Sequence, residues 1–140
     1  MKIITWNLNS RTNLETLNKQ CDYLKEQDLD LITLQEVTLN SQEFFKDYFK
    51  NWNILSSFDF VSDKSVLVKK RKYGQLIISK DRITPIEPFS SMPFPEGLLS
   101  GHIKNKNIEI HTTHVPPGSS NGVIKVQHFE ELYKFLENRK

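Results

Sequence analysis

The first third of the chain alternates between apolar patterns typical of strands and of helices. Residues 2–6 are rich in β-formers and end at Asn7, which predicts a short strand that runs into a polar loop. Apolar residues then recur at spacings of three and four and predict a helix over roughly residues 12–27, capped by Thr12 or Asn13. Its stripe consists of Leu14, Leu17, Cys21 and Leu24. The run Leu29–Leu34 is dense in Leu and Ile, so a buried strand follows, and the three elements are typical of a βαβ opening.

The rest of the chain predicts an aromatic helix, several strands and a final helix. Ser41 can cap the second helix, and its aromatic residues, often four apart, favour packing on a sheet over a ligand box. These residues are Phe44, Phe45, Tyr48, Phe49 and Trp52. Further strands are predicted at Ile54–Leu55, Val66–Val68, Leu76–Ser79 and Ile108–Val115. Four prolines make Thr84–Gly97 a long loop or a sheet edge. The last helix is predicted from the spacing of Val126, Phe129, Tyr133 and Leu136.

Length and composition are those of one ordinary globular domain. The chain has 140 residues, of which 37% are hydrophobic, and this predicts a single domain over residues 1–140. A net charge of +2 neither favours nor excludes nucleic acid as a partner. Cys21 is the one cysteine; its helical position favours a buried thiol over a nucleophile, and the lack of a possible disulfide favours a reducing compartment. No run is typical of a signal peptide or a membrane span, so we expect a soluble, cytoplasmic protein.

Three polar residues continue rows of side chains at the ends of predicted strands. Asn7 follows the first strand, Glu36 follows the second, and His114 ends the last one. Glu36, for example, is in phase with Ile32 and Leu34. Side chains alternate along a strand, so each polar group extends the row to which it belongs. Because sites in α/β folds form beyond the carboxyl ends of strands, we expect the three groups to meet at one rim of the core.

Each of these residues has an ordinary explanation when it is taken alone. An Asn after a strand is usually a turn residue, a lone Glu is usually solvated, and a lone His is usually structural. Together they suit phosphodiester hydrolysis, which needs a hard cation held by oxygen ligands. Glu36 is then a ligand for Mg²⁺ or Mn²⁺, and Asn7 can contact both the metal and a phosphate oxygen. His114 can stabilise the developing charge or transfer a proton.

The basic run Lys69–Lys72 precedes Tyr73 and Gly74. A solvated hairpin tip between two strands is the favoured interpretation. The functional interpretation is a loop that overhangs a site and attracts phosphate groups.

Four short runs occur in the order and spacing of the endonuclease/exonuclease/phosphatase superfamily, a group of DNase-like enzymes. They are ITWNLN at 4–9, LITLQEV at 31–37, YGQLIIS at 73–79 and THVPPG at 113–118. The short elements are common individually, and four in order are moderately specific. The chain resembles the amino-terminal half of such an enzyme.

The resemblance implies half of a four-layer α/β sandwich, with a mixed β-sheet and helices on the outer face. It implies that Glu36 is the metal-binding glutamate, that Asn7 belongs to the same metal and phosphate cluster, and that His114 is catalytic. Asn9 matches a nearby substrate-binding position. A loop near the substrate in some members is matched by Ser119, Ser120 and Asn121.

The carboxy-terminal motifs of the family have no counterpart in this sequence. Family members carry a Gly-Asp-x-Asn element and a later Asp-His pair, and neither string occurs here. We therefore expect a Mg²⁺-dependent phosphoesterase of the nuclease or phosphodiesterase type, with an incomplete site and little or no turnover by this chain alone. The substrate is a phosphate ester, with nucleic acid, phospholipid or a small phosphodiester all open.

The alternative is a non-catalytic fragment or interaction half-domain. A lone half would expose a large apolar sheet face, and such faces mark interfaces. It would then need a second copy of itself, a complementing chain or the missing carboxy-terminal half.

Overall fold

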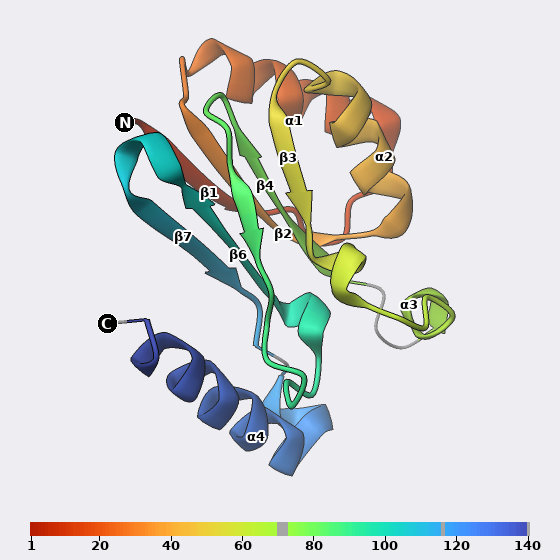
Figure 1. The fold of residues 1–140 in the computed structure, drawn as a ribbon. Coiled ribbons are helices and arrows are strands. Elements are labelled where there is room, and N and C mark those ends of the chain that lie inside the picture. Colours follow the sequence, from red (N-terminus) through yellow and green to blue (C-terminus); the bar gives the residue numbers. More distant parts are fainter. Residues whose placement is uncertain (70–72, 116, 140) are drawn as a thin grey trace.

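Two β-sheets pack face to face, and helices lie on the outer side of each (Figure 1). The computed structural model describes residues 1–69, 73–115 and 117–139, without the side chains at positions 68, 69 and 119–121. The first sheet has the order β1 (Ile3–Asn7), β2 (Leu31–Val37), β4 (Gly74–Ser79) and β3 (Asn53–Ser56). The second has the order β5 (Thr84–Ile86), β6 (Leu98–Ile103) and β7 (Ile108–Thr113). These layers confirm the predicted half of a four-layer α/β sandwich.

The helices of the described residues complete the outer layers. On the first sheet lie α1 (Leu14–Glu26) and α2 (Leu39–Tyr48), and against the second lies α4 (Gly118–Glu137). A single turn, α3 (Val66–Lys69), precedes β4. Short 3₁₀ turns are η1 (Ser57–Phe60), η2 (Pro95–Gly97) and η3 (Lys104–Lys106).

The predicted βαβ opening is confirmed, with one correction at the second helix. β1 and β2 pair in parallel across α1, and β4 runs antiparallel between β2 and β3. Asn13 caps α1 by accepting from the N–H of Thr16 at 3.0 Å. The cap of α2 is Thr38 rather than the predicted Ser41. Ser41 instead accepts from the N–H of Thr38 at 2.9 Å and completes a capping box.

Three apolar layers hold these elements together. The largest lies between the helices and the first sheet and includes Leu17, Leu24, Ile32, Leu34, Phe45 and Phe49. Between the sheets the buried residues are Leu31, Ile77, Ile83, Leu99 and Ile103. A third cluster of Met92, Leu98 and Phe135 joins the second sheet to α4. Each layer therefore removes the apolar side of one element from water.

One strand prediction in the middle of the chain is wrong, and one strand was not predicted. Val66–Val68 lies in α3 instead of a strand: the Asp63 side chain accepts from the N–H of Ser65 at 3.0 Å and starts a turn, and Leu67 is then buried in the first core layer. The central strand β6 was not predicted, because Ser100, Gly101 and His102 interrupt its apolar pattern. Thr84–Ile86 is an edge strand, in agreement with its proline.

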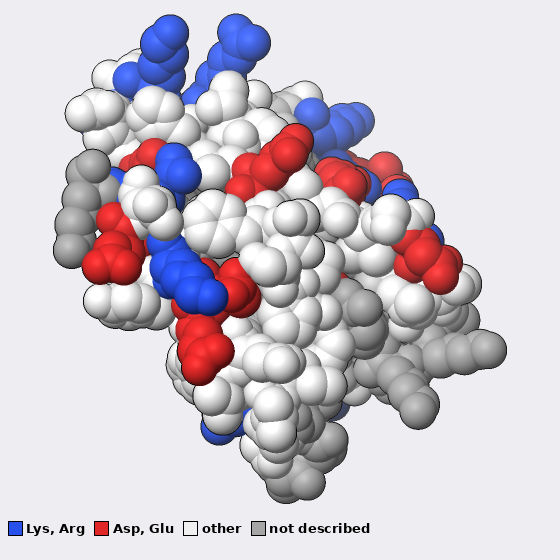
Figure 2. All heavy atoms as spheres, turned by 60° about the horizontal axis from the view of Figure 1, so that its bottom comes forward, with Lys and Arg blue, Asp and Glu red and all other residues white. Residues whose placement is uncertain are grey.

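The apolar stripe that predicts α4 is not the face of the helix that packs against the rest of the protein. The stripe of Val126, Phe129, Tyr133 and Leu136 is exposed, with fractions of 57%, 49%, 66% and 43%. The buried face instead carries Phe135 and His128. From the side of α4, Figure 2 shows a wide area without charged side chains, with charged groups near its margins. The exposed side of α4 is therefore apolar, an arrangement typical of an interaction surface.

Both sheets end in an uncovered edge strand. β1 is the edge of the first sheet and β7 the edge of the second, and both lie on the same side in Figure 1. Ile3 on β1 is 46% exposed. The expected large exposed sheet face is not found, because Leu31, Ile77 and Leu99 are fully buried between the two sheets; the part that stays open is the flank between the two edges. Within the described residues, none of the helices combines the length and the apolar character needed to cross a membrane.

Candidate active site

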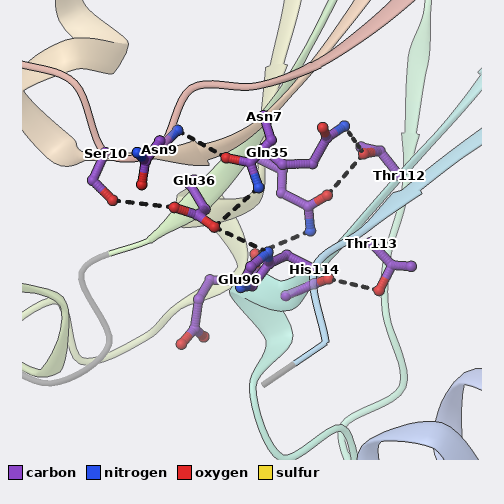
Figure 3. Close-up of polar contacts among 11 residues, drawn as sticks. Asn7, Asn9, Ser10, Gln35, Glu36, Glu96, Thr112, Thr113 and His114 are labelled. Carbon is purple, nitrogen blue, oxygen red and sulfur yellow. Dashed lines mark hydrogen bonds and ion pairs between the residues drawn. The ribbon is translucent and has the colours of Figure 1, made fainter. Parts of the chain in front are cut away.

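Asn7, Glu36 and His114 meet at one rim of the two sheets (Figure 3). The Asn7 Nδ2 donates to Oε1 of Glu36 at 3.0 Å, and Nδ1 of His114 lies 3.8 Å from the same oxygen. The side chains of Glu36 and His114 are 20% and 31% exposed, so both are open to solvent. One residue ends β1, one lies in β2 and one follows β7. The predicted meeting of the three groups is present in the structure.

Glu36 reaches this rim through a bulge in β2. The pairing of β2 with β4 shifts between Leu34 and Val37, and Glu36 has a φ of 53°, in the left-handed region. Ile32 and Leu34 pack towards the helices, so regular alternation would carry Glu36 to that side as well. The bulge turns its side chain towards Asn7 and His114 instead. The strand phase that predicted the position of Glu36 is therefore wrong at this point, and the bulge is what brings Glu36 to the rim.

The loop after β1 adds two more contacts. The N–H of Asn9 donates to Oδ1 of Asn7 at 2.8 Å, and the Ser10 hydroxyl lies 3.4 Å from Oε2 of Glu36. Asn9 and Ser10 both have positive φ values, 50° and 56°. This tight turn fixes the amide of Asn7 with its nitrogen towards the carboxylate. Ser10 was not predicted, and its only signal in the sequence is its place in the same polar loop.

Gly97 in η2 holds the backbone of His114. Its carbonyl accepts from the N–H of His114 at 2.8 Å and from the Thr113 hydroxyl at 2.9 Å. A Cβ on Gly97 would lie 2.9 Å from Cε1 of His128 and 3.1 Å from the carbonyl oxygen of His114. Glycine is needed here because the chain passes so close to both histidines.

His128 of α4 is a buried histidine behind the site that the sequence did not single out. Neither ring nitrogen has a hydrogen-bond partner among the described residues. Burial lowers the pKa of His128, the nearby charge of Glu96 opposes this, and His114 adds to the lowering. The His128 ring is therefore expected to be uncharged at neutral pH and to pack against Gly97 as a neutral group.

The remaining predicted site residues are placed unequally. Asn9 contributes its backbone N–H to the Asn7 turn. The side chains of Ser119 and Asn121, together with Ser120 between them, lie outside the described residues. So do residues 70–72 of the basic run, together with the side chain of Lys69.

A divalent cation would find one carboxylate at this rim. Within the part of the chain that is described, no cluster of three or more His, Cys, Asp or Glu side chains could hold a metal. Mg²⁺ binds through one or two carboxylates and keeps several waters, so Glu36 alone fits a weak site of this kind. The oxygen of Asn7 already accepts from Asn9, and its nitrogen faces Glu36. Asn7 thus orients the carboxylate in this arrangement, and its role as a ligand stays a prediction.

An open groove of about 500 Å³ runs from this cluster along the uncovered flank. Its walls come from the two edge strands and from β2. They include Ile3, Thr5, Asn7, Gln35, Ile110, Thr112 and His114. The candidate site is therefore one end of a groove that has strand edges on both sides.

Several solved structures share this fold with the chain. An AP endonuclease from Archaeoglobus fulgidus matches with 24% identity and a TM-score of 0.73, over 99% of this chain and 51% of that one. The 3′ phosphatase NExo (D146N) from Neisseria, bound to a product DNA hairpin, matches with 20% identity and a TM-score of 0.73, over 99% and 52%. D. rerio TDP2 complexed with single-strand DNA product matches with 15% identity and a TM-score of 0.67, over 96% and 54%. The chain thus spans about half the length of these proteins.

A search of curated protein sequences gave no match. The family model described as the Endonuclease/Exonuclease/phosphatase family matches residues 4–138, nearly the whole chain. Its match agrees with the layered fold and with the resemblance carried by the four sequence runs. This chain belongs to the Endonuclease/Exonuclease/phosphatase family, a superfamily of phosphoesterases and nucleases.

Proposed function

We propose that this chain supplies half of the active site of a Mg²⁺-dependent phosphodiesterase of the nuclease type. The observation that carries the proposal is the convergence of Asn7, Glu36 and His114 on one carboxylate oxygen at the open rim. Each residue comes from a different strand end, and all three stay accessible. A purely structural polar cluster would gain nothing from such exposure.

Glu36 is the group that would hold the cation. Asn7 donates to one carboxylate oxygen and the Ser10 hydroxyl lies near the other, so the carboxylate is held in one orientation. Bound Mg²⁺, or Mn²⁺ in its place, supplies neutralisation of phosphate oxygens and activation of the leaving group. Rigid support of a ligand from neighbouring side chains strengthens binding by on the order of tenfold.

His114 is the group that would act on the phosphate. Its Nδ1 faces Glu36, which leaves Nε2 on the far side of the ring. A ring nitrogen there can donate to an oxygen of the transition state or transfer a proton to the leaving group. The backbone hydrogen bond to Gly97 keeps the ring at the rim during this step.

The substrate that we propose is a phosphate ester in nucleic acid. The support comes from related folds, since the NExo and TDP2 structures contain DNA. The groove that leads away from His114 could follow an extended strand. Our proposal of a cytoplasmic location is supported by the buried free thiol of Cys21.

A second candidate function is a non-catalytic half-domain that requires a partner. It is favoured by the lack, among the described residues, of a group of three or more side chains that could hold a metal, and by the open flank between β1 and β7. The partner would be a second copy of this chain, a complementing chain or a following half of the same domain. It would cover the groove, and the half-domain by itself would not hydrolyse a phosphodiester.

Cleavage of plasmid DNA and of a bis-aryl phosphodiester separates the two functions. The variants are Glu36→Gln, which keeps the shape of the side chain, and Glu43→Gln on exposed α2 as a matched control. We expect slow cleavage that needs Mg²⁺ and falls on the order of 100-fold in Glu36→Gln only. Cleavage that is equal in both variants would refute the enzyme assignment for this chain. An absence of cleavage in all samples would favour the half-domain.

A further inference from the structure

A chain of buried side-chain hydrogen bonds crosses from the first sheet to the second directly beneath the site. Nε2 of Gln35 on β2 donates to the Thr112 hydroxyl on β7 at 2.9 Å. The Thr112 hydroxyl donates to Oε1 of Gln75 on β4 at 2.8 Å. Gln75 is fully buried and Thr112 is 6% exposed. Apart from these residues, the layer between the sheets is mostly apolar.

The donor and the acceptor of every bond in this series of hydrogen bonds are fixed. A Thr hydroxyl has one hydrogen, and Thr112 uses it for Gln75, so it can only accept from Gln35. The second hydrogen of the Gln35 amide goes to the hydroxyl of Thr5 at 2.9 Å. The Gln75 nitrogen then faces the carbonyl of Glu96 in a longer contact of 3.5 Å. Bonds that follow one direction polarise and strengthen each other in a buried setting.

Both ends of this series of hydrogen bonds adjoin residues of the candidate site. Gln35 directly precedes Glu36 at the bulge, and Thr112 lies two residues before His114. The far end reaches Glu96, and the next residue, Gly97, accepts from the N–H of His114. The two halves of the site therefore stand on opposite sheets and are joined through these side chains (Figure 3).

We propose that Gln75 and Thr112 are positioning residues that set the separation of Glu36 and His114. Apolar contacts are non-directional, so they define the offset between the two sheets less sharply than hydrogen bonds do. Directed hydrogen bonds allow a single register, and a buried amide without its partner is costly. The use of this geometry in catalysis rests on the proposed function, whereas the geometry itself does not.

The test is a double-mutant cycle read by NMR on the ring of His114, which needs neither metal nor turnover. The measured quantity is the chemical-shift change at the His114 ring on Glu36→Gln, first in the wild type and then in Thr112→Val. Thr112→Val keeps the shape and removes the hydroxyl. We expect the shift change to fall by about half or more in that background, since the two groups separate. Gln75→Asn, which shortens the amide by one carbon, is expected to give the same loss and replaces Thr112→Val if that variant does not fold.

Two controls separate positioning from general stability. Thr112→Ser restores the hydroxyl and is expected to restore the full shift change. Thr33→Val alters a buried threonine of β2 whose contact with Gln35 is long, at 3.4 Å. This variant is expected to keep the full shift change at the His114 ring. An unchanged shift response in both Thr112→Val and Gln75→Asn would overturn the inference. A lost response in a protein whose cleavage of phosphodiesters is the same in Glu36→Gln and Glu43→Gln would uphold the positioning role and refute the proposed function alone.

Discussion

Helices α1 and α4 have the same spacing of apolar residues, but most of the α1 stripe is buried and the α4 stripe is exposed. Of the α1 stripe, Leu17, Cys21 and Leu24 are at most 1% exposed, and only Leu14 at the start of the helix is exposed, at 63%. The equivalent stripe of α4 is 43% to 66% exposed at its four positions, Val126, Phe129, Tyr133 and Leu136. A spacing of three and four predicts a helix in both places. It carries no information on whether this chain supplies the surface that covers the stripe.

The difference follows the layers of the fold. The first sheet has a complete outer layer because α2 lies beside α1, and the apolar rows of β2 and β4 lie beneath both. On the second sheet α4 packs through Phe135 and leaves its other side in water. The open flank between β1 and β7 continues this pattern. One side of the molecule is thus closed, and the other keeps apolar side chains exposed.

The largest contrast is expected in thiol chemistry. Burial, with Asp22 as a second cause, raises the pKa of Cys21 from 9.0 to about 12. Since the thiolate is the reactive form, alkylation of the folded protein at pH 8 should be about 1000-fold slower than that of an unfolded control. A Cys21→Ser, Val126→Cys variant, with its thiol on exposed α4, should react at nearly the unfolded rate. Mass spectrometry of iodoacetamide time courses measures both, and equal rates would contradict the contrast.

The same thiol links stability to alkaline pH. Its folded pKa lies above its unfolded one, so the thiol favours folding fully below about pH 9 and loses this contribution as the pH rises towards 12. The urea midpoint of the wild type should therefore fall over this window more steeply than that of Cys21→Ala. Parallel pH profiles for the two proteins would show that Cys21 is not the cause.

Leucine truncation should distinguish the two helices next most strongly. Leu24→Ala on α1 should lower the free energy of unfolding by about 3 kcal/mol, because it leaves a cavity in a closed layer. Leu136→Ala on α4 starts from a side chain that is 43% exposed, and it should change that energy by less than about 0.5 kcal/mol. Urea denaturation followed by circular dichroism measures both values. A loss at Leu136 as large as that at Leu24 would mean that α4 packs more closely than described.

A smaller effect is expected at the cap of α2. Thr38 accepts from the N–H of Ser41 at 3.2 Å, and Thr38→Ala should cost about 1 kcal/mol of unfolding free energy. Thr38→Ser keeps the hydrogen-bond acceptor and should lower the unfolding free energy by only about 0.3 kcal/mol. An equal loss in both variants would assign the effect to the methyl group rather than to the cap.

The smallest effect on stability is expected on the exposed stripe itself. Phe129→Ser should leave the unfolding free energy within about 0.5 kcal/mol of the wild type. It should nevertheless weaken any self-association of the protein, because the substitution removes an aromatic side chain from an exposed apolar surface. Sedimentation velocity over a concentration series measures this. A dimer of unchanged affinity would place the contact elsewhere, for instance on the open strand edges.

The sequence predicted the elements of the closed side well and the central strand of the second sheet poorly. α1 is identified by a period of three and four residues, and β2 by an apolar run that is buried on both faces; β1 is identified by its β-formers, which are half-buried on one face. β6 was missed at Gly101, where a Cβ would lie 2.6 Å from Ile83 and 2.7 Å from Leu55. The two sheets approach closely there, and this long-range requirement for glycine appears in the sequence only as an interruption.

The candidate site was predictable in its residue types and not in its geometry. Asn7, Glu36 and His114 could be chosen because polar groups at strand ends are few and the family runs contain them. The bulge that turns Glu36 and the loop that places Ser10 depend on positive φ values at non-glycine residues, which no local pattern signals. The Gln35–Thr112–Gln75 link joins three strands far apart in the chain, so only the folded structure reveals it.

The most direct test of the central claim is a Mg²⁺ titration of the ¹⁵N-labelled chain followed by NMR. If Glu36 holds the cation with Asn7 and His114 beside it, saturable shifts should appear at the Asn7 side-chain amide and at the backbone of Glu36 and His114. These shifts should vanish in Glu36→Gln and persist in Glu43→Gln. Mg²⁺-induced shifts that survive Glu36→Gln, or that gather at another surface, would contradict the account.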